Sequence, residues 1–92
     1  MHDWLIETIK VDWESGDVRI LLSAFGQPKE IRVKGLCSLI VPRRFDWGPS
    51  EYVNGTVGPE VLENGHSVLK IEIQSGDQIL VEGEKILLPN CD

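Results

Sequence analysis

Residues that commonly carry out catalysis or bind metals are few in this chain, and their spacing matches no known motif. There are two histidines, His2 and His66, and two cysteines, Cys37 and Cys91. A catalytic serine or cysteine needs a base beside it, and neither histidine stands in a recognisable pattern with such a partner. The cysteines form no CxxC pair and have no histidine near them in the sequence, which argues against a zinc site. We therefore predict no catalytic residue and no metal ligand.

The signatures of other enzyme classes are missing as well. The sequence contains no GxGxxG motif and no P-loop, so it carries no nucleotide-binding fingerprint. No motif fixes two carboxylates at the separation that glycoside hydrolysis requires. His2, Asp3, His66 and Asp77 are residues of metal-ligand type, but they follow no spacing rule for a metal site. These observations predict a protein that is not an enzyme and has no cofactor.

A binding site is better supported, in the segment 42–50. It has two prolines, a glycine, two aromatic residues and three charges, and it divides a run of strand-like sequence into two halves. Arginine and the large aromatic residues are enriched at the energetic centres of protein interfaces. The candidate binding residues in and next to this segment are Arg43, Arg44, Asp46, Trp47, Glu51 and Tyr52.

The three tryptophans allow different interpretations. Trp47 precedes the rigid turn Gly48-Pro49, so it could be a preorganised anchor that loses little entropy when a partner binds. It could instead pack onto one end of the sheet as a plug, with the neighbouring arginines paired to acids as a surface brace. Trp13 extends an apolar strand face and is expected in the core. Trp4 is expected either as a flap over the sheet edge or as an exposed contact.

Apolar and polar residues alternate with a period of two over most of the chain, which predicts β-strands. These strands must therefore position the candidate binding residues. The strands predicted from this alternation are 5–13, 18–24, 30–41, 67–74 and 79–81. Ser15-Gly16-Asp17 and Ser75-Gly76-Asp77 have the composition of tight turns, with glycine where a positive φ is needed. Gly35 predicts a bulge or a bend in the long strand. Cys37 falls on the inner face of that strand and is expected to be a small core residue.

The segment 51–65 is less regular. It predicts a short strand at 51–54 that ends at the turn pair Asn54-Gly55. Pro59 is placed to begin one helical turn, which Asn64-Gly65 would end.

These elements predict a single all-β domain over residues 1–92, with six to seven antiparallel strands and essentially no helix. A β-sandwich, a β-roll and a partly open barrel all fit, because closure depends on strand tilt and shear. Cys37 and Cys91 are expected to be reduced, with a disulfide between them as the alternative.

The net charge of −6 is unevenly distributed and bears on the choice of partner. Through Arg44 there are six acids and seven bases, whereas from Phe45 onward there are nine acids and only Lys70 and Lys85 as bases. The acidic second half argues against nucleic acid as a partner. It suits a basic protein partner, although solubility alone also explains it.

Two other kinds of binding remain open. A homodimer could pair through a sheet edge, either the strand at 31–41 or the last hairpin. A small ligand could bind at a barrel mouth near Trp47 and His66. No apolar run is long enough to span a membrane, and the first residues lack the pattern of a secretory signal. We therefore expect no membrane partner and a cytoplasmic location.

Three short motifs carry a resemblance to a known group of proteins. Trp47-Gly48-Pro49-Ser50, Ile73-Gln74-Ser75-Gly76-Asp77 and the His2-Asp3 start together resemble small bacterial all-β proteins of unknown function. Those proteins have a proline-rich WGPS-like loop in mid-chain and a late IEIQSGD-like hairpin, and the group is similar to immunity proteins of polymorphic toxin systems. The resemblance implies a cytoplasmic protein that binds and neutralises a toxin, and it implies no catalytic residues.

Overall fold

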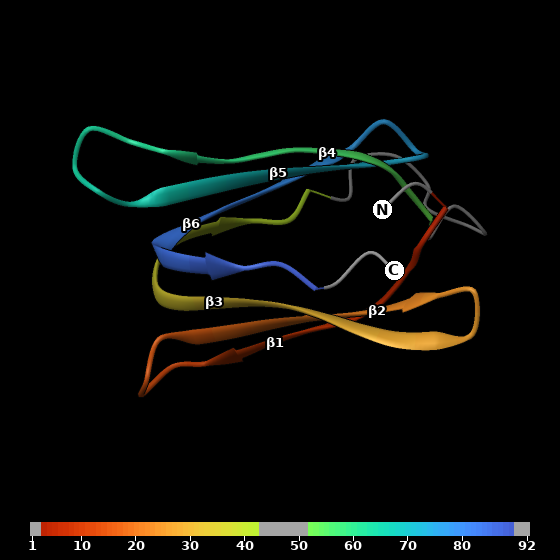
Figure 1. Ribbon diagram of the computed structural model, residues 1–92, viewed down its shortest axis with the longest axis horizontal. Coiled ribbons are helices and arrows are strands. Elements are labelled where there is room, and N and C mark those ends of the chain that lie inside the picture. The colour runs from red at the N-terminus through yellow and green to blue at the C-terminus, as the bar shows by residue number, and fades with distance from the viewer. Residues whose placement is uncertain (1–2, 43–51, 90–92) are drawn as a thin grey trace.

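Six antiparallel strands form one sheet in the computed structural model, which describes residues 3–42 and 52–89 (Figure 1). The strands are β1 (Leu5–Asp12), β2 (Asp17–Ala24), β3 (Gln27–Ile40), β4 (Val53–Val61), β5 (Ser67–Ile73) and β6 (Gln78–Leu87). Their order in the sheet is β1-β2-β3-β6-β5-β4. The predicted all-β class and the number of strands are confirmed. The part of the chain that is described contains no helix long and apolar enough to cross a membrane.

The sheet is open, but it curls until its two edge strands touch at one end. Leu5 of β1 forms a bridge with Tyr52, just before β4. Beside it, the Val53 amide donates to the Trp4 carbonyl at 2.7 Å, and the Asp3 amide donates to the Val53 carbonyl at 2.9 Å. In Figure 1, β1 and β2 lie on one side of the molecule and β4 and β5 on the other, while β3 and β6 connect the two. Among the architectures left open by the sequence, this one corresponds to a partly open barrel.

The hydrophobic core lies on the inner face of the curled sheet, as the alternation predicts. Fully burying one Val, Leu or Ile side chain contributes about 1.5–3 kcal/mol. Trp4 is buried and covers the core where the edge strands meet. Of its two predicted positions, the flap over the sheet edge is therefore the correct one. The buried hydrophobic residues are Trp4, Val18, Ile20, Leu22, Ala24, Ile31, Val33, Val53, Leu69, Ile71, Ile73, Ile79 and Val81.

The pairing of β3 with β6 contains the bend that Gly35 predicted. Gly35 has a φ of +65°, and the register shifts between Leu36 and Ser38. Leu36 pairs with Gly83 and Ser38 pairs with Glu82, so Cys37 is the extra residue of a β-bulge. A bulge shifts the alternation of side chains by one residue. The expectation that Cys37 lies in the core is therefore wrong, because its side chain is exposed.

Both Ser-Gly-Asp segments form the predicted tight turns. Gly16 and Gly76 have φ values of +77° and +99°. In the second turn, the Ser75 hydroxyl accepts a hydrogen bond from the Asp77 amide at 3.3 Å. The first turn repeats this contact between Ser15 and Asp17 at 3.2 Å. At the start of this turn, Asp12 Oδ1 accepts hydrogen bonds from the backbone amides of Glu14 and Ser15. The same short motif thus satisfies backbone donors at two hairpins.

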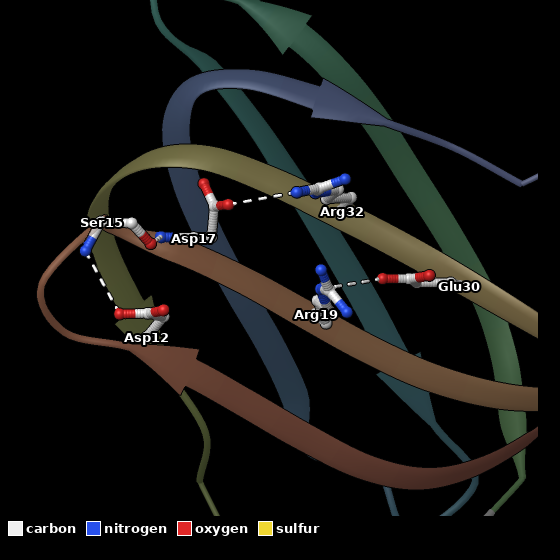
Figure 2. A network of polar contacts seen from close by, with 6 residues as sticks. All are labelled: Asp12, Ser15, Asp17, Arg19, Glu30 and Arg32. Carbon is white, nitrogen blue, oxygen red and sulfur yellow. Dashed lines mark hydrogen bonds and ion pairs between the residues drawn. The ribbon is translucent and has the colours of Figure 1, made fainter.

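Two ion pairs connect β2 and β3 next to the first turn (Figure 2). Arg32 contacts Asp17 at 3.3 Å, and Arg19 contacts Glu30 at 3.4 Å. All four side chains are at least a quarter exposed, so each pair contributes little to stability. They help to specify the register of these strands.

Trp13 does not lie in the core, contrary to the prediction. Its side chain is 90% exposed, in the turn beyond the end of β1, and Val11 is also largely exposed although its partner Val18 is fully buried. The alternation of side chains correctly assigns Val11 to the inner face. It does not tell whether other elements cover that face, and β1 is an edge strand.

The segment after Tyr52 is a longer strand than predicted. β4 continues through Asn54-Gly55 and Pro59, so both the predicted turn pair and the predicted helical turn are wrong. Register shifts at these two places show that each is a bulge within the β4–β5 ladder. Asn54 Nδ2 in the side chain donates to Glu72 Oε1 on β5 at 2.7 Å, and this hydrogen bond holds the first bulge in place. The turn falls later, where Gly65 has a φ of +87°.

We predict that Gly83→Ala destabilises the fold. A Cβ at this position would lie 2.5 Å from Val33 Cγ1 and 3.0 Å from the Lys34 carbonyl oxygen, where β3 and β6 bend together. Such overpacking costs about 1–3 kcal/mol, and each kcal/mol lowers the Tm of a domain of this size by about 4–8 °C. Gly55→Ala is the matched control, because a Cβ there meets nothing within 4 Å. Equal Tm values for the two variants in thermal unfolding would contradict this account of the bend.

Candidate functional site

Of the predicted binding residues, only Tyr52 belongs to the described part of the chain. The others, Arg43, Arg44, Asp46, Trp47 and Glu51, lie outside the described residues. Tyr52 is 43% exposed, and its carbonyl accepts a hydrogen bond from the Gln74 amide at 3.0 Å. It lines a cavity of about 590 Å³ at the end of the sheet where β1 and β4 meet.

This end cavity combines aromatic and polar groups from distant parts of the sequence. Besides Tyr52, it is lined by Asp3, Leu5, Ser23, Phe25, Gly26 and Gln74. Phe25 is 84% exposed and has a φ of +52°, in the turn between β2 and β3. The volume is within the range of small-ligand sites. Sequence analysis missed Phe25, because nothing in the sequence indicates that its turn lies near Tyr52.

A second candidate surface lies on the outer face of β3, β6, β5 and β4. The register places Ile40, Leu80, Lys70 and Val57 side by side in one row across these four strands. Ile40 is 51% exposed and Val57 is 58% exposed. Two apolar side chains of this size are thus open to solvent on strands that are paired within the sheet.

The next row of the same face is more polar. It consists of Ser38, Glu82, Val68 and Glu60. Val68 and Leu80 line both of two shallow hollows, of about 200 and 170 Å³, which makes the two hollows continuous. We call the apolar residues of the two rows, Ile40, Val57, Val68 and Leu80, the outer apolar patch.

Carboxylates dominate the charge around the outer apolar patch. Glu60 and Glu82 line its hollows, with Lys70 as the basic residue there. Glu72 lies on β5 beyond Lys70, where its carboxylate accepts a hydrogen bond from the Asn54 side chain. Residues 52–89 contain six carboxylates against two lysines, so the strands that carry most of the patch are acidic overall.

At one side of the patch, Glu82 belongs to a cluster with Cys37 and His66. One ligand-type atom from each of the three side chains, the Cys37 sulfur, a His66 ring nitrogen and a Glu82 carboxylate oxygen, lies within 4.8 Å of the other two. His66 Nδ1 is 3.1 Å from Glu82 Oε2, and both side chains are less than a third exposed. His66 lies in the turn before β5, and its side chain is partly covered.

The backbone holds each member of this cluster in place. Cys37 occupies the β3 bulge, and Glu82 lies on β6 between paired residues of β3 and β5. His66 stands in the turn before β5, where its amide donates to Asn64 Oδ1 at 3.0 Å and its carbonyl accepts from the Leu62 amide at 2.7 Å. The cluster is thus built on the adjacent strands β3 and β6 and on the turn that leads into β5.

The surroundings of Cys37 keep its thiol protonated. Desolvation, the hydrogen bond to Glu82 and the negative charge of that carboxylate all raise the pKa of the Cys37 thiol. A catalytic cysteine needs the opposite, a pKa lowered by a cationic neighbour. The free cluster is therefore poorly suited to nucleophilic catalysis, although its thiol, imidazole and carboxylate are all metal-ligand types.

Sequence analysis did not find this cluster for a topological reason. His66 follows Cys37 by 29 residues and Glu82 follows His66 by 16, so no local motif exists. The sheet order places β6 between β3 and β5, which brings the three residues together. Cys37 carries a free thiol, and Cys91 lies outside the described residues.

Comparisons with protein-family models, with curated proteins and with solved structures give no match.

We predict that Glu82→Gln accelerates alkylation of the Cys37 thiol at neutral pH. Removing the carboxylate charge lowers the thiol pKa, so a larger fraction is present as the reactive thiolate. The rate is measured with iodoacetamide in a Cys91→Ser background, where Cys37 is the only cysteine. Glu84→Gln removes a carboxylate from the same strand and should leave the rate unchanged. Equal rates for the two glutamine variants would rule out control of the thiol by Glu82.

Proposed function

We propose that this protein is a non-enzymatic binding domain that recognises another protein through the outer apolar patch. The observation that carries this proposal is the exposure of Ile40 and Val57 in one row with Leu80, on a face otherwise rich in carboxylates. An apolar centre with a charged rim is the usual composition of a protein interface. Exposed apolar groups that are contiguous, rather than scattered, are typical of such contact sites.

Charge complementarity points to a basic partner. Glu60 and Glu82 border the hollows of the patch, and the strands around it carry more acids than bases. A partner with an apolar centre and surrounding lysines or arginines would bury the patch and pair with these carboxylates. Opposite charges also accelerate the encounter of the two proteins. The same acidity disfavours nucleic acid, whose phosphates require a basic surface.

The resemblance to immunity proteins of toxin systems supports a toxin as this partner. In that role the protein acts in the cytoplasm and neutralises the toxin by covering a surface the toxin needs. This mechanism requires complementary surfaces and no catalytic residues.

Small-ligand binding at the end cavity is the second candidate function. Its supporting observation is the cavity of about 590 Å³ lined by Tyr52, Phe25 and Asp3. An aromatic wall with a few polar groups is typical of small-ligand sites. Phe25→Ala separates the two candidates, because this side chain lines the end cavity and is not part of the outer apolar patch.

We predict that Val57→Asp weakens partner binding at least about thirtyfold, which corresponds to about 2 kcal/mol. A carboxylate in place of Val57 would be buried under the partner's apolar surface and desolvated without a compensating contact. The wild-type chain and its variants are tested in pull-downs against the proteins encoded by adjacent genes, and affinities are then measured by calorimetry.

Val11→Asp is the matched control, because it places the same charge on an exposed valine of β1 and should retain affinity. Co-expression should also relieve the toxicity of the partner, and Val57→Asp should abolish this relief. Three results would contradict the proposal: equal binding by the two variants, retention of a nucleic acid or metabolite instead of a protein, or a stable homodimer in light scattering that Val57→Asp converts to a monomer.

A further inference from the structure

We propose that Cys37, His66 and Glu82 form a binding site for a divalent transition-metal ion of the zinc class. Their ligand atoms all lie within 4.8 Å of one another, and they come from three adjacent strands or strand ends. This inference goes beyond the proposed binding function, because it concerns a different kind of ligand.

The distances suit a tetrahedral ion after small side-chain rotations. Zinc bonds of about 2.0–2.3 Å place neighbouring ligand atoms about 3.3–3.8 Å apart. His66 Nδ1 and Glu82 Oε2 are already 3.1 Å apart, and the Cys37 sulfur lies within 4.8 Å of both groups. Cys37 is exposed and both partners are half-buried, so their side chains can adjust without a change in the backbone.

The donor set selects the class of ion. A thiolate and an imidazole favour zinc and other late first-row metals, whereas magnesium and calcium prefer sites made of oxygen atoms. Three protein ligands leave one of the four positions of a tetrahedral ion open. Water would occupy that position, and the Cys37 thiol would release its proton to solvent on binding.

The arrangement of hydrogen bonds explains why a metal fits better than a catalytic cysteine. The thiol of Cys37 and the ring of His66 both contact the same Glu82 carboxylate. In a cysteine–histidine pair, the histidine must instead stand as a base to the thiol. A metal ion at the centre of the cluster would replace these two contacts to one carboxylate with three metal–ligand bonds.

The backbone around the cluster is already in place to receive an ion. The turn of His66 is held by hydrogen bonds to Asn64 and Leu62, and Glu82 is in a strand paired on both sides. Binding therefore does not require the ordering of a loop. A site of this kind on paired strands loses little conformational entropy when it closes around an ion.

The test is titration of the purified chain with Co²⁺, followed by displacement with Zn²⁺. We expect one Co²⁺ per chain, a thiolate-to-cobalt charge-transfer absorption band, and loss of that band when an equivalent of Zn²⁺ is added. Cys37→Ser should remove the band. His66→Asn and Glu82→Gln should each weaken Co²⁺ binding at least tenfold. Far-ultraviolet circular dichroism without metal verifies that each variant is folded.

Two matched variants should keep the band: Cys91→Ser retains all three proposed ligands, and Glu84→Gln removes a carboxylate of β6 that is not one of them. The proposal is overturned if no charge-transfer band appears, or if the band survives in Cys37→Ser. It is also overturned if the band depends on Cys37 but is unchanged in both His66→Asn and Glu82→Gln, which would indicate a lone thiol. Val57→Asp should bind Co²⁺ normally, so failure of the metal site and failure of the outer apolar patch are distinguishable.

Discussion

The antiparallel pairing of β3 with β6 is the interaction on which the rest of this structure depends. It joins β1 and β2 on one side to β4 and β5 on the other. Its bend adds to the natural twist of the sheet, so that the inner residues of both halves share one core. The bend combines the positive φ of Gly35 with the close approach of Gly83 to Val33. Two residues without side chains thus allow one sheet to enclose its own core.

The same pairing also creates the candidate site on the outer face. The bulge next to the bend directs the Cys37 side chain outward. Glu82 remains paired with Ser38, and its carboxylate lies within 4.8 Å of a His66 ring nitrogen. Glu82 therefore takes part in both features of this face, because it lines one hollow of the outer apolar patch and also stands at the centre of the cluster.

Much of the fold was accessible from the sequence because sheet formation follows local rules. The alternation on β2 and β5 identified the buried residues, and the Ser-Gly-Asp segments identified two turns. The predictions were wrong where the tertiary structure overrides a local sequence pattern. Asn54-Gly55 has the composition of a turn, yet the neighbouring strand β5 keeps it in a bulge through the contact with Glu72. Trp13 continues an apolar pattern, but it lies past the end of an edge strand, where its side chain is 90% exposed.

The sequence by itself determined the all-β class, the inner faces of most strands, the two tight turns and the acidic character of the second half. These properties depend on residues that are close together in the chain. Only the tertiary structure decided which strands are neighbours, where the sheet bends and which side chains meet. The order β3-β6-β5 brings Cys37, His66 and Glu82 together across long sequence separations, and it aligns Ile40 with Val57 in one row. Such contacts depend on strand order and register, which arise from the packing of the whole sheet and leave no local pattern in the sequence.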